Sequence, residues 1–128
     1  MQKKTLMKKT FLITIIAAIF GSCSNKPAVK LPSFTEIEHK IYSIPAKRQI
    51  SIRVYINETG YNNEQVKALT DSLYLEAKYE KTQYGNPTHV FVYVYAKNGD
   101  YELSSGSWIA TRQKIQDDEQ ETIIKAAQ

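Results

Sequence analysis

Hydrophobic and polar residues alternate along two segments of the chain, and this pattern predicts two β-strands. In residues 49–57 every second residue is aliphatic (Ile50, Ile52, Val54 and Ile56), with polar residues or tyrosine between them. A period of two places one set on a buried face of a sheet and the other on a face that is at least partly wet. Residues 36–44 alternate less regularly and end before Pro45, which predicts an edge strand.

The next segment has the period of a helix, over about residues 63–81. Its apolar residues fall on one stripe at helical spacing: Val66, Leu69, Leu73 and Ala77. Asn62 is a suitable N-cap, and Gln65 occupies the reciprocal position of a capping box. Gly85, Asn86 and Pro87 then interrupt the chain.

Residues 88–96 are apolar or aromatic at every second position on both sides, which is typical of a central strand. The dipeptide Asn98-Gly99 predicts a hairpin turn, because both residues accept a positive φ. The chain is then expected to return antiparallel over residues 100–112, with a bend at 104–106. Acidic residues from 117 to 121 predict the first turn of a C-terminal helix that includes Ile123 and Ile124.

Together these segments predict an α+β fold with a small mixed β-sheet. We expect a βαββ core, an extra N-terminal edge strand, a crossover helix on one face and a short C-terminal helix. The crossover should be right-handed and place its helix on the face of Ile50 and Val90.

The opposite face of this sheet is the one constellation with functional content. By parity it carries, beside Ser51, the residues Arg53, Tyr55, Phe91, Tyr93 and Tyr95, with Trp108 nearby. Tyrosine and tryptophan offer large rigid contact areas with a polar tip, so these six residues form a candidate binding face. The alternative is that the segment around Ile37 or the C-terminal helix covers this face. Burial of Tyr93 and Tyr95 within the monomer would favour that alternative.

The first 23 residues have the parts of a secretory signal. Four lysines and no acid precede an apolar run at residues 11–20, and small residues lead to Cys23, the only cysteine. The run is too short to cross a bilayer as a permanent helix, which needs roughly 20 apolar residues. The leader could begin at Met1 or at Met7, and an ordinary signal with a chance cysteine is the alternative interpretation.

The sequence Phe20-Gly21-Ser22-Cys23 resembles the lipobox of bacterial lipoproteins. The resemblance implies that a diacylglycerol is attached to the sulfur of Cys23 and that the leader is cleaved before it. Residues 1–22 are then a signal peptide, 23–33 a lipidated tether, and 34–128 a single domain. Two or three acyl chains would make the attachment effectively permanent. We expect no cofactor apart from this covalent lipid.

The excess of basic over acidic residues lies in the expected leader. The net charge is +4 with 17 basic and 13 acidic residues, and four of the lysines precede Cys23. The remainder is neutral, so its charge gives no argument for nucleic acid. No cysteine is left for an intramolecular disulfide.

Little supports catalysis. His39 and His89 are the only histidines, and neither belongs to a cluster with metal-ligand spacing, so we assign no catalytic residue and no metal site. The favoured interpretation is a non-catalytic binding domain of the bacterial cell envelope, bound to the membrane through its lipid, whose partner is an envelope protein or a glycan. An inhibitor or immunity-type lipoprotein and a small envelope hydrolase are the alternatives.

In the lipoprotein family, Asp after the cysteine is associated with retention in the inner membrane, and an acidic run with surface export. Ser24-Asn25-Lys26 has neither, so the resemblance implies the periplasmic face of the outer membrane, with the inner membrane as the alternative. The mature part, through segments such as Ile41-Tyr42-Ser43-Ile44-Pro45 and Trp108-Ile109-Ala110, resembles small bacterial domains of unknown function. The oligomeric state stays open.

Overall fold

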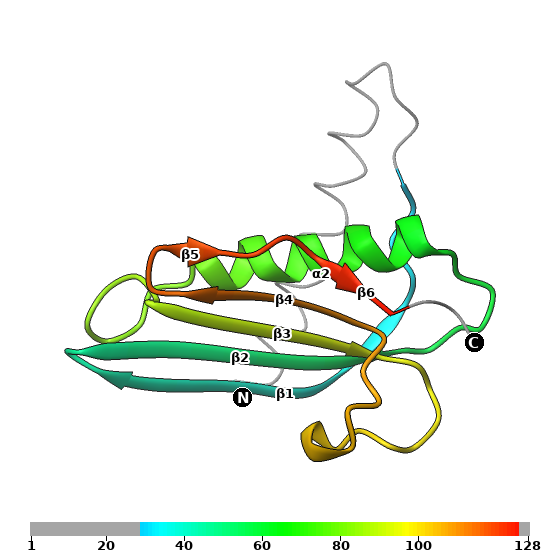
Figure 1. Cartoon of the computed structure of the whole chain (residues 1–128), viewed down its shortest axis with the longest axis horizontal. Coiled ribbons are helices and arrows are strands. Elements are labelled where there is room, and N and C mark those ends of the chain that lie inside the picture. Colours follow the sequence, from blue (N-terminus) through cyan, green and yellow to red (C-terminus); the bar gives the residue numbers. More distant parts are fainter. Residues whose placement is uncertain (1–28, 126–128) are drawn as a thin grey trace, which may run out of the picture. The chain divides into compact units, whose positions relative to one another are not determined.

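The computed structural model describes residues 29–125, and from Leu31 onward they form one compact unit. Within residues 29–125, one helix and six strands follow one another (Figure 1). In order, the elements are β1 (Phe34–Ile44), β2 (Lys47–Ile56), α2 (Asn63–Lys78), β3 (His89–Tyr95), the 3-10 turn η1 (Leu103–Ser105), β4 (Ala110–Ile115), β5 (Asp118–Glu119) and β6 (Ile123–Ile124).

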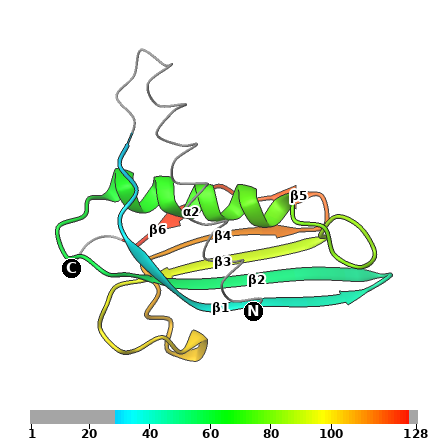
Figure 2. The same ribbon diagram turned by 180° about the vertical axis from the view of Figure 1, so that it is seen from behind.

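The strands form a single mixed sheet in the order β1-β2-β3-β4-β5, with β6 also paired to β4. β2 and β3 are parallel and are joined through α2, whereas all other neighbours are antiparallel. β3 is central and β1 lies at the edge, which confirms both predictions (Figure 2). The predicted α+β fold with a βαββ core and an extra N-terminal strand is also confirmed.

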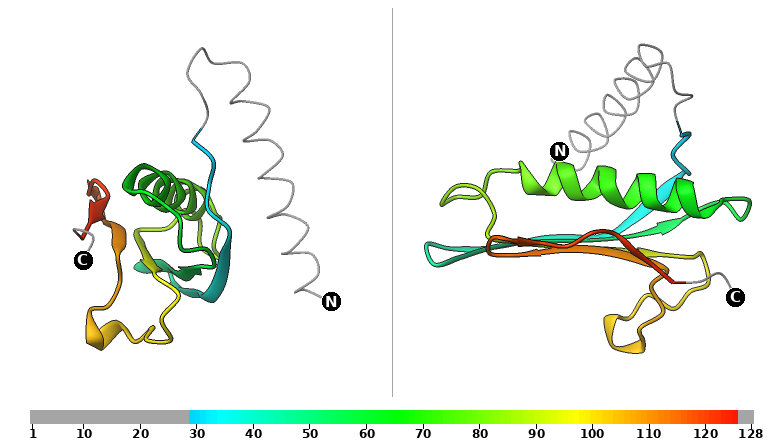
Figure 3. Two further views of the ribbon diagram at one scale, coloured as in Figure 1. Left: turned by 90° about the vertical axis from the view of Figure 1, so that its right-hand side faces the viewer. Right: turned by 45° about the horizontal axis from the view of Figure 1, so that its top comes forward.

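The helix covers one face of the sheet, as predicted (Figure 3). The aliphatic residues of β2 and β3 and the apolar stripe of α2 make up one buried core; its largest contributors include Ile50, Ile56, Leu69, Tyr74 and Val90. At the start of the helix the capping box is present in both directions. The Asn62 side chain accepts from the Gln65 N–H (2.9 Å), and the Gln65 side chain accepts from the Asn62 N–H (3.0 Å).

The predicted C-terminal helix is wrong. The chain turns at Gln116, whose φ is +56°, and returns along β4 as the short strands β5 and β6. Ile115 pairs with Asp118 across this two-residue turn. A Gln-Asp pair lacks the glycine that marks most such turns, which is why the sequence pattern did not reveal it.

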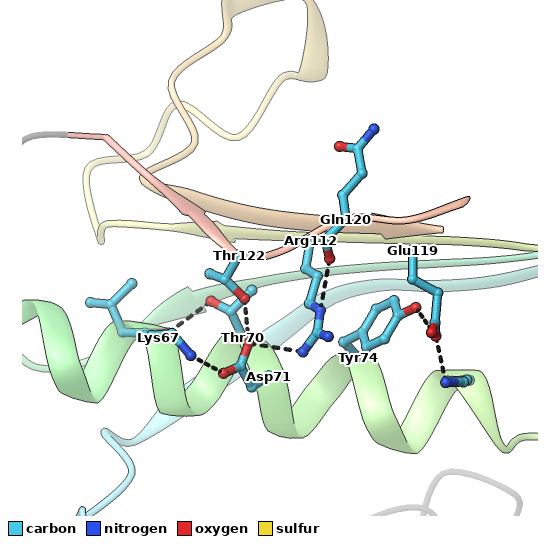
Figure 4. A network of polar contacts seen from close by, with 10 residues as sticks. Lys67, Thr70, Asp71, Tyr74, Arg112, Glu119, Gln120 and Thr122 are labelled. Carbon is cyan, nitrogen blue, oxygen red and sulfur yellow. Dashed lines mark hydrogen bonds and ion pairs between the residues drawn. The ribbon is translucent and has the colours of Figure 1, made fainter. Parts of the chain in front are cut away.

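Side chains of α2 hold this C-terminal segment in place (Figure 4). Asp71 accepts hydrogen bonds from Lys67 (2.6 Å), from Arg112 of β4 (3.1 Å) and from Thr122. The helix that supplies these side chains is already packed on the core. Pairing with β4 therefore stabilises the C-terminal segment more than an isolated short helix would.

A second group of contacts fixes β5 on the same helix. Tyr74 donates to Glu119 (2.8 Å), and Lys78 forms an ion pair with the same carboxylate. The Arg112 guanidinium lies over the Tyr74 ring, 4.2 Å from its centroid. Glu119, one of the acidic residues that suggested the dipole of a helix start, is thus a partner of α2 instead.

The predicted hairpin at Asn98-Gly99 is also wrong. Gly99 does have a positive φ of 84°, and Asn98 accepts a hydrogen bond from the Asp100 N–H. The flanking residues nevertheless do not pair. Residues 96–109 leave the sheet as one loop, which contains η1 and lies on the face opposite α2 (Figure 3), and the antiparallel return strand β4 begins only at Ala110.

Candidate functional site: the open face of the sheet

The face opposite α2 carries its side chains in rows across the strands; the row of Tyr55 and Tyr95 lies at one end, and three more rows follow it. One row contains Glu38, Arg53 and Tyr93; the next contains Lys40, Ser51 and Phe91; the third contains Tyr42, Gln49 and His89. The parallel register of β2 and β3 aligns Arg53 with Tyr93 and Ser51 with Phe91, which is the juxtaposition that parity predicted. We call this surface the open face.

The loop of residues 96–109 covers one end of the open face. The Tyr101 ring is stacked on the Tyr55 ring, with centroids 4.9 Å apart and an angle of 7° between the planes. It also meets the Tyr95 ring edge-on at 5.8 Å. Tyr95 is completely buried as a result, and its hydroxyl makes no hydrogen bond of normal geometry within residues 29–125. Burial raises the pKa of this hydroxyl, and the nearby Arg53 charge opposes the rise.

Arg53 joins the loop to the sheet. Its Nε donates to the Glu38 carboxylate of β1 (2.9 Å), and its Nη1 donates to the Tyr101 carbonyl. One guanidinium therefore bonds a neighbouring strand and the loop at the same time, which its rigid fork of donors allows. The role of Arg53 in this structure is to position the loop.

Beyond the loop the open face is hollowed over Ser51. The groove has a volume of about 660 Å³, and it runs between Lys40 and Tyr42 on one side and Phe91 and Tyr93 on the other. Ser51 is the smallest side chain in its row, so the longer neighbours rise around it. Gln49 Nε2 donates to the Ser51 hydroxyl (3.1 Å), which gives the floor a polar character.

The groove is bordered by two cations that have no counterion among the residues that the structure describes. Lys40 and Lys47 line it, and neither makes an ion pair or a side-chain hydrogen bond within the described part of the chain. The only acid in the lining is Glu38, which Arg53 already neutralises. The pKa of His89, near Lys47 on the same face, is lowered by partial burial and by the charges of Lys47 and Lys114. The local field therefore favours an anionic or carboxylate-bearing ligand.

The structure places the six residues of the candidate face in three different locations. Arg53, Phe91 and Tyr93 line the groove. Tyr55 and Tyr95 lie beneath the loop, and Trp108 stands in the loop itself, 6.3 Å from the Tyr93 ring. Tyr93 remains partly exposed and accepts a hydrogen bond from Gln113 (3.1 Å), so burial removes Tyr95 from the candidate binding face but leaves Tyr93 on it. The cover is residues 96–109, not the Ile37 segment or a C-terminal helix.

Five further residues that line the groove were not among the predicted site residues: Glu38, Lys40, Tyr42, Lys47 and Leu103. The alternation in residues 36–44 places Glu38 and Lys40 on the opposite side of the strand from Ile41. Pairing this segment with residues 49–57 would have predicted that Glu38 and Lys40 lie on the open face. Leu103 comes from η1, and no periodicity in the sequence brings this residue to the sheet.

A smaller hollow of about 480 Å³ lies beside Trp108, between the loop and the start of α2. The Lys125 ammonium lies over the Trp108 ring, 4.0 Å from its centroid, and bonds the Gly106 carbonyl. This cation is already bound by the protein, so we assign no ligand to the second hollow.

The two histidines lie on opposite faces of the sheet. His39 pairs across the strands with Ile52 and faces the helix side, where its ring bonds Glu80 (2.8 Å), whereas His89 pairs with Gln49 on the open face. They cannot act on one substrate together. No group of three His, Cys, Asp or Glu side chains suited to a metal ion occurs within residues 29–125.

No family model, no curated protein and no solved structure matches this chain. Among the helices that the structure describes, none has the length and apolar character needed to cross a membrane.

Proposed function

We propose that this chain is a lipid-anchored protein of the bacterial cell envelope whose open face binds a partner without chemistry of its own. The anchor is argued from Phe20-Gly21-Ser22-Cys23, which lies outside the described residues. The binding role is argued from the groove over Ser51. A groove of this volume, bordered by partly exposed aromatic side chains and by lysines that have no ion pair within residues 29–125, has the mixed apolar and polar lining of a binding site.

The partner is an envelope protein or glycan that presents carboxylates beside apolar groups. Lys40 and Lys47 would bind the carboxylates, and Phe91 and Tyr93 would contact the apolar groups. A partner enzyme whose activity falls on binding would make the protein an inhibitor of the immunity type. The opposite placement of His39 and His89 speaks against the hydrolase alternative.

Metabolic labelling with a fatty-acid analogue tests the anchor. We expect label on the native protein and none on Cys23→Ala, together with a mature N-terminus at Cys23. An intact Met1 or Met7 terminus, or an unmodified thiol at position 23, would overturn the anchor and the envelope location.

Site-specific photo-crosslinking in intact cells tests the groove. A crosslinker in place of Phe91 should give a discrete adduct, whereas one in place of Leu75, which is 48% exposed on α2, should not. Mass spectrometry of the adduct then separates a protein from a glycan. Ser51→Trp fills the groove from its floor and should remove the adduct while thermal unfolding stays cooperative. The same adduct from both positions, or an adduct that survives Ser51→Trp, would refute binding in the groove.

A further inference from the structure

We propose that β1 is a pairing edge for a second copy of this chain, so that two sheets join through antiparallel β1 strands. The inference rests on the proposed function, because a membrane anchor confines the copies to one plane and raises their effective concentration. The same strand, β1, forms one wall of the groove through Lys40 and Tyr42.

The main-chain groups along this edge are directed outward. Arg48 of β2 turns its N–H and its carbonyl toward Thr88, on the side of β3, at 2.9 and 2.8 Å. Residues of an antiparallel pair alternate between groups that bond across the pair and groups that point away from it. Ser43, which pairs with Arg48, therefore points its N–H and carbonyl away from β2. Ile41 and His39 follow at intervals of two and do the same.

This edge is regular over residues 38–44. The single irregularity of the β1–β2 register falls between Glu36 and Glu38, and Pro45 follows the strand at its other end. Within the described residues β1 has only β2 as a strand neighbour, so its outer edge stays unpaired. A long unpaired edge without a bulge is a template for adding a strand.

Apolar side chains gather on the same stretch. Ile41, Tyr42 and Ile44 are 47%, 50% and 42% exposed, which is unusual for three large residues within four positions. An added strand would cover part of each. These side chains therefore stand beside the outward main-chain groups that a partner strand would bond.

The sequence of this edge fits a second copy. Ile41 is the midpoint of residues 38–44, so an antiparallel pair centred there has the longest ladder that avoids both the bulge and Pro45. In that register Ile41 meets Ile41 of the second copy, and Lys40 meets Tyr42 of the second copy, where the ammonium can lie against the ring. The segment after the leader has equal numbers of acids and bases, so two copies do not repel each other through net charge.

The arrangement extends the proposed binding site. Residues that face each other across an antiparallel pair lie on the same face of the joined sheet. Lys40 and Tyr42 of both copies would thus stand between the two grooves, and both open faces would be on one side. The ladder is too short for a large interface, so we expect the pair to depend on the anchor.

Disulfide crosslinking of the full-length chain in its membrane tests this inference. With Cys23 lipidated, Ile41→Cys carries the only free thiol, and two such residues directly opposite each other suit a disulfide. Under mild oxidation we expect at least a tenfold stronger dimer band from Ile41→Cys than from Thr35→Cys. Thr35 is an exposed residue of the same strand and would lie far out of register. Equal bands from the two variants would overturn the pairing.

Ile41→Pro provides a second test that leaves β1 in place. It removes an N–H that points away from β2, and proline is tolerated at such positions of an edge strand. After chemical crosslinking in the intact membrane, two differently tagged copies should co-purify as wild type and lose that association at least tenfold as Ile41→Pro, with thermal unfolding still cooperative. Undiminished association would refute the inference. Absence of fatty-acid label from the native chain would count against the anchor alone, whereas equal bands from Ile41→Cys and Thr35→Cys in a labelled, membrane-bound chain would count against the pairing alone.

Discussion

The ring of Tyr101 lies parallel to the ring of Tyr55, with 4.9 Å between their centroids. This stack joins a loop with no regular pairing to the end of β2, and the Arg53 guanidinium bonds the Tyr101 carbonyl beside it. The contact decides which part of the open face is closed and which part stays accessible as a groove.

Replacing the stacked ring tests how much the loop contributes. Tyr101→Ala should lower the free energy of unfolding by about 2 kcal/mol, because it removes a half-buried aromatic ring and uncovers Tyr95. Tyr101→Phe keeps the stack and should stay within about 0.5 kcal/mol of wild type. Urea unfolding followed by far-UV circular dichroism measures both. Faster proteolysis within residues 96–109 in the alanine variant alone would show that the loop has detached.

His39 gives the stability a dependence on pH. Its hydrogen bond to Glu80 raises the pKa of His39 above the ordinary value of 6.5, the charges of Glu80, Glu36 and Glu76 add to this, and partial burial opposes it. A raised pKa in the folded state means that the stabilisation is complete below the unfolded value and is lost as the pH rises through the folded value. We expect the unfolding free energy to fall as the pH rises above the ordinary histidine value of 6.5. His39→Gln should flatten that part of the profile, and an unchanged slope would contradict the assignment.

Asp71 and Arg112 connect α2 to β4, and their contribution can be measured by a double-mutant cycle. Asp71→Asn and Arg112→Gln, alone and combined, should give a coupling energy of about 1 kcal/mol in thermal or urea unfolding. Partial burial disfavours the Asp71 charge, but hydrogen bonds from Lys67 and Thr122 and the charge of Arg112 outweigh it and lower the pKa of Asp71. Its stabilisation is therefore present at neutral pH and lost as the pH falls through the folded value.

A coupling energy indistinguishable from zero would show that the contact of Asp71 with Arg112 contributes nothing to stability. Lys67→Gln serves as a comparison, since Lys67 also bonds Asp71 but is exposed, and its loss should cost less than about 0.5 kcal/mol.

The capping box of α2 offers a matched pair of adjacent asparagines. Asn62→Ala removes the side-chain acceptor of the Gln65 N–H and should cost about 1 kcal/mol. Asn63→Ala changes an exposed residue of the first turn and should stay within about 0.5 kcal/mol of wild type. Equal losses from both variants, measured by urea unfolding, would mean that the cap does not stabilise the helix.

The placement of the site was predictable in part. The strict alternation in β2 and β3 brought Arg53, Phe91 and Tyr93 to one face, because side-chain parity along a strand is local information. The same parity did not predict that Tyr95 is buried. Its burial depends on Tyr101, a residue from a loop that has no periodicity and that contacts the sheet only in the folded chain.

By itself, the sequence determined the elements whose patterns are strong and local: the two central strands, the capped helix, and the face on which that helix packs. It also contains Phe20-Gly21-Ser22-Cys23, the segment on which the proposed anchor depends. Only the tertiary structure decided that residues 117–124 pair with β4 instead of forming a helix, and that residues 96–109 close half of the open face. The physical reason is that both segments are too short to stabilise themselves. Each adopts the conformation in which side chains of the sheet and helix can bind it: Arg53 binds the loop, and Asp71, Tyr74 and Lys78 bind the C-terminal segment.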